Sequence, residues 1–177
     1  MRKLAFAAAL TLGLSVPASA DLPEGAKAPL FSTQAALAGK EYGFNLRSAL
    51  AKGPVVLYFY PKAFTKGCTL EANAFAEAMP EFKALGASVV GMSNDDIETL
   101  KRFSVEECRD AFAVGVASRK IIDAYDVALV RDGKDTGVTS RTSYVISQNG
   151  EIVMVHSDMD YRDHVRMTLQ AVRNLTN

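Results

Sequence analysis

The alternation of apolar and polar residues predicts a chain built from strands and helices in turn. Residues 55–60 are apolar on both faces and rich in β-branched and aromatic side chains, which is typical of a central strand in a covered sheet. Pro61 ends this strand, because proline cannot donate a hydrogen bond to a neighbouring strand. The alanine-rich residues 69–79 then predict a helix that ends before Pro80.

A second apolar run, residues 87–92, predicts the next strand and so a βαβ unit with parallel strands. Asp95, followed three residues later by Glu98, resembles a capping box at the start of another helix. Apolar residues repeat there at helical spacing: Ile97, Leu100 and Phe103. If this helix persists, Cys108 lies near the same face. Residues 21–43 are expected to form an irregular lead-in.

The end of the chain predicts an antiparallel hairpin and a closing helix. Residues 143–146 and 152–155 are β-prone and flank Asn149 and Gly150, a pair that favours a tight hairpin turn. An amphipathic helix follows, marked by Val165, Leu169 and Val172. The whole order indicates a single α/β domain with a central mixed sheet flanked by helices.

The first twenty residues have the organisation of a secretory signal peptide. Arg2 and Lys3 precede an apolar run, and residues 18–20 read Ala-Ser-Ala, an A-x-A cleavage site. The run is too short to cross a bilayer. We therefore predict a signal peptide at residues 1–20 and an exported domain, periplasmic or secreted, at residues 21–177.

Charge and composition exclude some partners. Without Arg2 and Lys3, 18 basic residues remain against 20 acidic ones, and no basic tract is present. A nucleic-acid backbone or an anionic membrane surface is therefore not an expected partner. With 49% hydrophobic residues, the chain can bury a full core without disulfide support.

Cys68 and Cys108 are the only cysteines in the chain. In an oxidising compartment, composition alone favours a structural disulfide between them. The position of Cys68 suggests a different role, because it lies where a predicted strand gives way to a predicted helix. A thiol attacks only as thiolate, and the unpaired N–H groups and positive dipole of a helix N-terminus favour an anion.

Pro61, Thr65 and Cys68 form the pattern P-x-x-x-T-x-x-C directly after the buried strand. This pattern resembles the active-site signature of peroxiredoxins, and Glu71 and Arg141 also match positions of that family. The resemblance extends over most of the chain after the signal peptide and is closest to the Q-type group, the bacterioferritin comigratory proteins. It implies a thioredoxin-like fold and a thiol-dependent peroxidase with no metal, haem or flavin cofactor.

The resemblance also implies a role for each residue. Cys68 would attack hydrogen peroxide or an organic hydroperoxide and become a sulfenic acid. The Thr65 hydroxyl would hydrogen-bond the thiolate and the peroxide, and Pro61 would shield Cys68 from water. Arg141 would favour the thiolate and donate to the peroxide oxygens, and Glu71 would orient Arg141 or favour the helix N-terminus.

Many Q-type members carry a second cysteine five residues after the first, where this chain has Asn73. The resemblance therefore implies Cys108 as the resolving residue, through an intramolecular disulfide that requires local unwinding. A thioredoxin-like protein or a small thiol would reduce this disulfide. The chain could act as a monomer or a dimer.

Simpler interpretations remain open at this point. Cys108 could be a buried apolar residue, Arg141 a surface strand residue, and Pro61 and Thr65 a plain turn. His156 and His164 lack further ligands at zinc spacing and are expected to be packed or solvated. A thiol-disulfide exchanger would need C-x-x-C, whereas residues 65–68 read Thr-Lys-Gly-Cys. A scaffold domain with a permanent disulfide is the non-enzymatic alternative.

Overall fold

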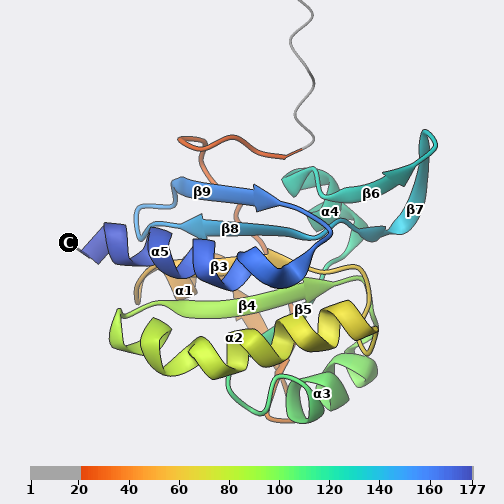
Figure 1. The fold of residues 1–177 in the computed structure, drawn as a ribbon, viewed down its shortest axis with the longest axis horizontal. Coiled ribbons are helices and arrows are strands. Elements are labelled where there is room, and N and C mark those ends of the chain that lie inside the picture. Colours follow the sequence, from red (N-terminus) through yellow and green to blue (C-terminus); the bar gives the residue numbers. More distant parts are fainter. Residues whose placement is uncertain (1–20, 177) are drawn as a thin grey trace, which may run out of the picture.

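A computed structural model describes residues 21–176, so the predicted signal peptide lies outside the described residues. One large sheet organises this part of the chain (Figure 1). Its strands are β1 (Ser32–Leu37), β2 (Lys40–Asn45), β3 (Val55–Phe59), β4 (Ser88–Ser93), β5 (Ala113–Val116), β8 (Thr142–Ile146) and β9 (Ile152–Ser157). Their order is β2-β1-β5-β4-β3-β8-β9. A separate hairpin consists of β6 (Ala128–Arg131) and β7 (Lys134–Thr139).

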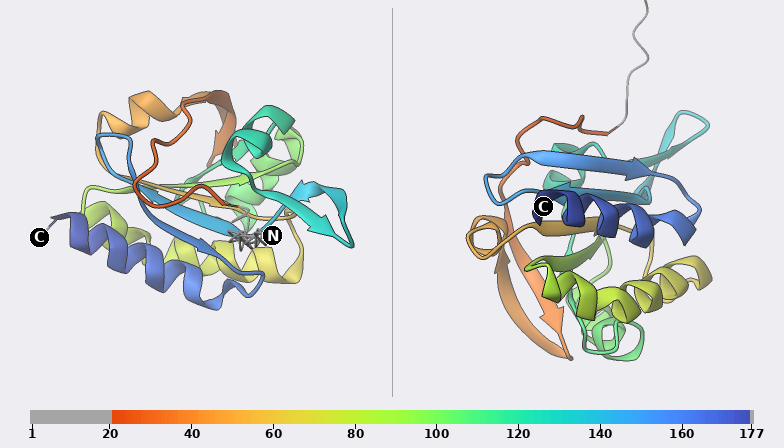
Figure 2. Two further views of the ribbon diagram at one scale, coloured as in Figure 1. Left: turned by 90° about the horizontal axis from the view of Figure 1, so that it is seen from above. Right: turned by 60° about the vertical axis from the view of Figure 1, so that its left-hand side comes forward.

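Helices cover both faces of the sheet. They are α1 (Leu46–Leu50), α2 (Lys66–Ala84), α3 (Ile97–Glu106), α4 (Arg119–Tyr125), a short 3-10 helix η1 (Tyr161–Asp163) and α5 (His164–Thr176). Figure 2 (left) shows α1 and α4 on one side of the sheet and α2 and α5 on the other. Within the described residues, no helix is long and apolar enough to span a membrane.

The central strand β3 explains why there are two cores. All five of its residues are buried, and successive side chains point to opposite faces of a sheet. Val56 and Tyr58 join the core beneath α2, whereas Val55 and Leu57 join the core beneath α4. The β3-α2-β4 unit is parallel and the β8-β9 hairpin is antiparallel, as the sequence predicts. The predicted α/β fold with a mixed sheet is therefore confirmed.

The expectation of an irregular lead-in at residues 21–43 holds for residues 21–31 but was wrong from Ser32 onward. Within it, β1 forms an antiparallel hairpin with β2, and Ala38 and Gly39 make the turn with positive φ. Only the small side chains Ala35 and Ala36 of β1 are buried, and β2 is almost entirely exposed. In β2, Phe44 alone is buried, so this edge hairpin lacks the continuous apolar run that marks the central strand in the sequence.

The predicted end of α2 before Pro80 was also wrong, because the helix continues to Ala84. Proline removes one backbone donor from the helix. However, Pro80 faces solvent while Met79 and Phe82, on either side of it, are buried in the core. Packing of these side chains outweighs the missing hydrogen bond.

The N-cap of α3 is Asp96 rather than the predicted Asp95. The Asp96 carboxylate accepts from the Thr99 N–H at 2.8 Å. Asp95 instead accepts from the Ala63 N–H at 2.8 Å, and so ties the loop after β3 to the end of β4. The helix ends at Glu106, so Cys108 lies beyond it, in a turn. Three further features, β5, α4 and the β6-β7 hairpin, were not predicted from the sequence.

Candidate active site

Cys68 lies in the first turn of α2, directly after the loop that leaves β3. Its side chain is 1% exposed. The first backbone N–H groups of a helix have no partner within the helix, and they carry the positive end of its dipole. The fold therefore places a buried sulfur where negative charge is stabilised.

Arg141 is the residue directly before β8, and its guanidinium reaches the sulfur of Cys68. Its Nη2 donates to Cys68 Sγ at 3.5 Å, its Nη1 donates to Glu71 Oε2, and its Nε donates to the Met159 carbonyl at 3.0 Å. The side chain is 5% exposed. Three contacts in three directions fix the plane of the guanidinium, with one edge facing the sulfur.

Glu71 lies one turn after Cys68 on α2 and is fully buried. Burial raises the pKa of Glu71 to about 8, although the positive charge and hydrogen bond of Arg141 oppose this rise. For Arg141, burial favours a lower pKa, but the nearby Glu71 and Cys68 outweigh it and raise the pKa above its usual value. The guanidinium therefore stays charged at every working pH.

The other two motif residues lie in the loop that precedes α2. Pro61 is half-buried at the end of the central strand. Thr65 is the exposed N-cap residue, and its hydroxyl donates to the Lys62 carbonyl at 2.9 Å rather than to Cys68. Between them, Phe64 adopts a positive φ of 63° and packs edge-on against Phe103 of α3, with ring centroids 5.2 Å apart. The structure thus brings Arg141 to Cys68 but directs the Thr65 hydroxyl elsewhere.

Cys108 is fully buried, and both cysteines are free thiols. Burial, followed by the negative charges of Glu107 and Asp110, raises the pKa of Cys108 well above its usual value. The two cysteines belong to the same apolar core. The buried rings of Tyr58 and Tyr60 lie near both cysteines. Burial, and to a smaller extent the two sulfurs, raises the pKa of each tyrosine well above its usual value.

Two polar contacts hold residues 107–110, the turn that carries Cys108, against α2. Asn73 Nδ2 donates to Glu107 Oε2 at 3.2 Å, and Arg109 Nη1 pairs with Glu77 Oε1 at 3.2 Å. Arg109 and Asp110 both have positive φ, at 51° and 57°. Neither is a glycine, so two consecutive left-handed residues make this turn locally strained. We refer to residues 107–110 as the Cys108 turn.

Two histidines lie beside Glu71 and Arg141, a position that no local pattern in the sequence indicated. His164 is fully buried, with Nδ1 2.8 Å from Ser143 Oγ and 3.7 Å from Glu71 Oε1. The His156 ring lies against it, with centroids 4.5 Å apart. For Ser143 the sequence did contain one signal. Ser143 is two residues after Arg141, and residues two apart in a strand point to the same face of the sheet. Among the described residues, no three His, Cys, Asp or Glu side chains gather as they would around a metal.

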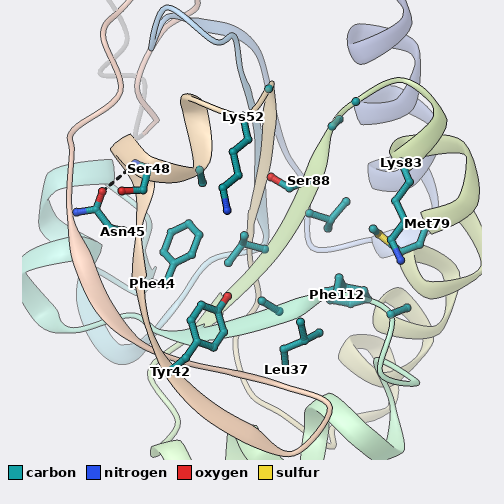
Figure 3. A pocket seen from close by; sticks show the side chains of 18 of the residues that line it. Leu37, Tyr42, Phe44, Asn45, Ser48, Lys52, Met79, Lys83, Ser88 and Phe112 are labelled. Carbon is teal, nitrogen blue, oxygen red and sulfur yellow. Dashed lines mark hydrogen bonds between the residues drawn. The ribbon is translucent and has the colours of Figure 1, made fainter.

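A separate cavity of about 530 Å³ lies elsewhere in the fold. Figure 3 shows Tyr42 and Phe44 on one side of it, and Met79 and Phe112 on the other. Neither cysteine lines it. Hence this cavity is not part of the arrangement around Cys68.

Comparison with known proteins gives consistent results. The AhpC/TSA family pattern matches residues 25–155. The chain is 30% identical over 158 residues to the chloroplastic peroxiredoxin Q of Suaeda salsa, covering 88% of this chain and 70% of that protein. The crystal structure of peroxidoxin BcpB from Mycobacterium tuberculosis superposes with a TM-score of 0.76 at 28% identity, covering 86% of this chain and 97% of that one.

A second solved structure is that of the Xanthomonas campestris bacterioferritin comigratory protein, which was studied for alkyl peroxide reduction. It superposes with a TM-score of 0.72 at 28% identity, covering 81% of this chain and 92% of that one. The similarity thus extends over most of the described residues, both in sequence and in fold.

Proposed function

Because this chain belongs to the AhpC/TSA family and is a thiol-dependent peroxidase of the Bcp and peroxiredoxin Q type, we propose that Cys68 is the residue that attacks the hydroperoxide. The observation that carries the proposal is the 3.5 Å contact between Arg141 Nη2 and Cys68 Sγ at the N-terminus of α2. A guanidinium and a helix N-terminus both favour thiolate over thiol.

In the proposed reaction, the Cys68 thiolate attacks one oxygen of the peroxide and the O–O bond breaks. The sulfur gains that oxygen as a sulfenic acid, and the leaving oxygen takes up a proton to become water or an alcohol. Negative charge moves from the sulfur to the leaving oxygen during this step. Arg141 donates hydrogen bonds where this charge develops, without having to reorganise.

Thr65 and Pro61 complete the proposed peroxide pocket. A rotation about the Thr65 side-chain bond would move its hydroxyl from the Lys62 carbonyl toward the peroxide, where it can both donate and accept. Pro61, which is half-buried beside this loop, would limit the access of water. Both residues act at the mouth of the site rather than at the sulfur.

We propose that Cys108 resolves the sulfenic acid. Its thiol condenses with Cys68–SOH to give a disulfide and water, and a thioredoxin-like protein or a small thiol then reduces the disulfide. Disulfide geometry requires the two Cα atoms to lie within about 7 Å. Since Cys108 is buried behind contacts with α2, the Cys108 turn must open during this step.

Hydrogen peroxide and organic hydroperoxides are the proposed substrates. The activity studied for the Xanthomonas campestris relative supports the organic class. We also propose that residues 1–20 direct export to the periplasm or the exterior. Cell fractionation with intact-mass analysis tests this proposal: a mature chain that begins at Asp21 supports it, and a cytoplasmic chain that retains Met1 contradicts it.

A three-protein comparison tests the assignment of the cysteines. Peroxide consumption with dithiothreitol should be lost in Cys68→Ser and retained in Cys108→Ser, because external thiol can reduce the sulfenic acid directly. Intact mass after one equivalent of peroxide should show a disulfide in the wild type and oxygenated Cys68 in Cys108→Ser. Full activity of Cys68→Ser would disprove the assignment of the attacking residue.

A further inference from the structure

The polar side chains behind Arg141 leave one atom without a partner. Glu71 uses Oε2 to bind Arg141, but within residues 21–176 its Oε1 has no hydrogen-bond partner although it is buried. A buried oxygen in this state is costly. His164 Nδ1 faces it at 3.7 Å, a gap about 0.7 Å longer than a hydrogen bond.

The hydrogen bonds of His164 determine which of its nitrogens carries the proton. Its Nε2 lies 2.9 Å from the Asp158 carbonyl, which can only accept, so Nε2 carries the hydrogen. In the neutral ring Nδ1 is then an acceptor, and the Ser143 hydroxyl donates to it. This nitrogen has one lone pair, and two groups face it: the Ser143 hydroxyl at 2.8 Å and Glu71 Oε1 at 3.7 Å. If Glu71 Oε1 carries a proton, a small approach of the two side chains lets it share that lone pair, and Oε1 then gains a partner.

The loop between β9 and α5 holds this arrangement together. The Asp158 carbonyl accepts from His164, and the Met159 carbonyl accepts from Arg141 Nε at 3.0 Å. The Asp158 N–H also donates to the Arg141 carbonyl at 3.1 Å. His164 and Arg141 are thus fixed by the same short segment, so that the position of one is linked to that of the other.

Charge balance gives an independent reason for a proton at this place. When Cys68 is a thiolate, the buried site holds Cys68 and Glu71 as two potential negative charges against one positive charge, Arg141. An unbalanced charge in a buried site is expensive. One proton on the pair formed by Glu71 and His164 makes the site neutral.

Building on the function proposed above, we propose that His164 is a positioning residue of the peroxidase: it shares one proton with Glu71 Oε1 and so keeps Oε2 in place to orient Arg141 against Cys68. Ser143 supports this role by fixing the ring. His164 touches neither the sulfur nor the substrate and acts only through Glu71 and Arg141.

The groups around the pair agree with this distribution of charge. Burial, with His156 and Arg141 as further causes, lowers the pKa of His164 to about 4, although the Asp158 carbonyl and carboxylate oppose this. The ring is therefore neutral near pH 7 and can accept the shared proton. Tyr58 also lies near Glu71, and its fully buried hydroxyl stays neutral because burial raises its pKa well above the usual value, so it adds no positive charge that would favour an ionised Glu71.

Glu71→Gln is the decisive variant, because its amide copies a protonated carboxyl group. The amide oxygen can accept from Arg141 and the amide NH₂ can donate to His164 Nδ1. We expect Glu71→Gln to keep kcat/KM within about threefold of the wild type, and Glu71→Ala to lose about tenfold or more. A loss in Glu71→Gln as large as that in Glu71→Ala would overturn the shared proton.

His164→Phe tests the positioning role. The ring volume is kept, but Arg141 loses its indirect support. We expect kcat/KM for peroxide to fall about tenfold, and the pH midpoint of Cys68 alkylation by iodoacetamide to rise by about one unit. A purely structural role would lower the melting temperature and leave this midpoint unchanged, which would contradict the proposal.

Ser143→Ala and His164→Gln keep the test valid if His164→Phe folds poorly. Ser143→Ala removes one hydrogen bond and should shift the alkylation midpoint in the same direction by a smaller amount. His164→Gln keeps an acceptor and a donor and should recover part of the loss. The matched control is Arg166→Lys on the same helix, because Arg166 is exposed and pairs with Asp163 rather than with Glu71, and it should leave the midpoint unchanged.

The wild type and Cys68→Ser separate this inference from the proposed function. If the wild type reduces peroxide and Cys68→Ser does not, the assignment of Cys68 stands whatever the His164 variants do. Unchanged rates and midpoints in His164→Phe and Ser143→Ala would then disprove the positioning role alone. Absence of peroxide reduction by the wild type would reject both.

Discussion

The guanidinium of Arg141 contacts the sulfur of Cys68 at 3.5 Å, although the two residues are 73 positions apart in the chain. One lies just before a strand and the other in the first turn of a helix. The sheet brings them together, because β3 leads into α2 and pairs directly with β8, which follows Arg141. In the proposed reaction, a thiolate at Cys68 is therefore stabilised from two elements of the fold at once.

Replacing Arg141 with lysine should lower kcat/KM for peroxide by about a hundredfold. Lysine keeps the charge, but a single ammonium group cannot contact Cys68, Glu71 and the Met159 carbonyl together. Stopped-flow peroxide reduction measures the effect. Arg162→Lys is the matched control, because Arg162 is exposed and pairs with nearby Asp160 rather than with any residue of the site. Equal rates for Arg141→Lys and the wild type would show that charge alone is sufficient.

Gly67→Ala should reduce activity without reducing stability. A Cβ at Gly67 would lie 3.2 Å from Arg141 Nη2, so the guanidinium would have to move by a few tenths of an ångström. In the helix itself, alanine is favoured over glycine by about 1 kcal/mol. We expect kcat/KM to fall several-fold while the melting temperature stays the same or rises.

Gly43→Ala is the control for Gly67→Ala, because a Cβ at Gly43 meets nothing within 4 Å. It should leave the rate of peroxide reduction unchanged. If Gly67→Ala were as active as the wild type, Arg141 would tolerate a displacement that the proposed mechanism does not allow.

Asn73→Ala should speed formation of the disulfide. Its side chain holds Glu107 at the edge of the Cys108 turn, and a hydrogen bond of this kind contributes about 1 kcal/mol. Loss of this contact should make opening of the turn about fivefold more favourable. Quenched-flow mass spectrometry after peroxide addition measures the rate. Asn174→Ala, at the far end of α5, is the control. A slower disulfide in Asn73→Ala would contradict the role of the turn.

Local sequence signals were sufficient to predict the centre of the site. The apolar run of β3, the stop at Pro61 and the helical pattern beyond it placed Cys68 at a strand-to-helix junction. Each of these signals depends on residues that are neighbours in the chain. The backbone preferences of such residues do not depend on where the segment lies in the fold. The same reasoning predicted the βαβ unit and the β8-β9 hairpin.

Features that depend on distant contacts could not be predicted. Whether Pro80 ends α2 depends on the burial of Phe82, and the edge hairpin β1-β2 depends on pairing of Ala35 and Ala36 with β5. His164 was expected to be merely packed or solvated. Its bonds reach Ser143, which is 21 residues away, and no local pattern encodes that distance.

His164 should also make stability depend on pH. Its pKa falls from the usual 6.5 to about 4 on folding, mainly through burial. Below pH 6.5 the unfolded chain binds a proton that the folded chain resists, so the unfolded state gains stability as the pH falls toward 4. The contribution of His164 to the free energy of unfolding is therefore fully present above pH 6.5, where it amounts to about 3 kcal/mol, and it is lost as the pH falls from 6.5 to 4.

Glu71 acts in the opposite direction over an overlapping range. Burial raises its pKa to about 8, so the folded chain holds a proton that the unfolded chain releases above its usual value of 4.5. Because of Glu71, the free energy of unfolding falls as the pH rises from 4.5 to 8. Because of His164, it rises as the pH rises from 4 to 6.5.

Urea unfolding at several pH values separates the contributions of Glu71 and His164. His164→Gln should lose stability less steeply than the wild type between pH 6.5 and 4, and Glu71→Gln should lose less between pH 6.5 and 8. Parallel curves for His164→Gln and the wild type would mean that the His164 ring is protonated as easily in the folded chain as in the unfolded one.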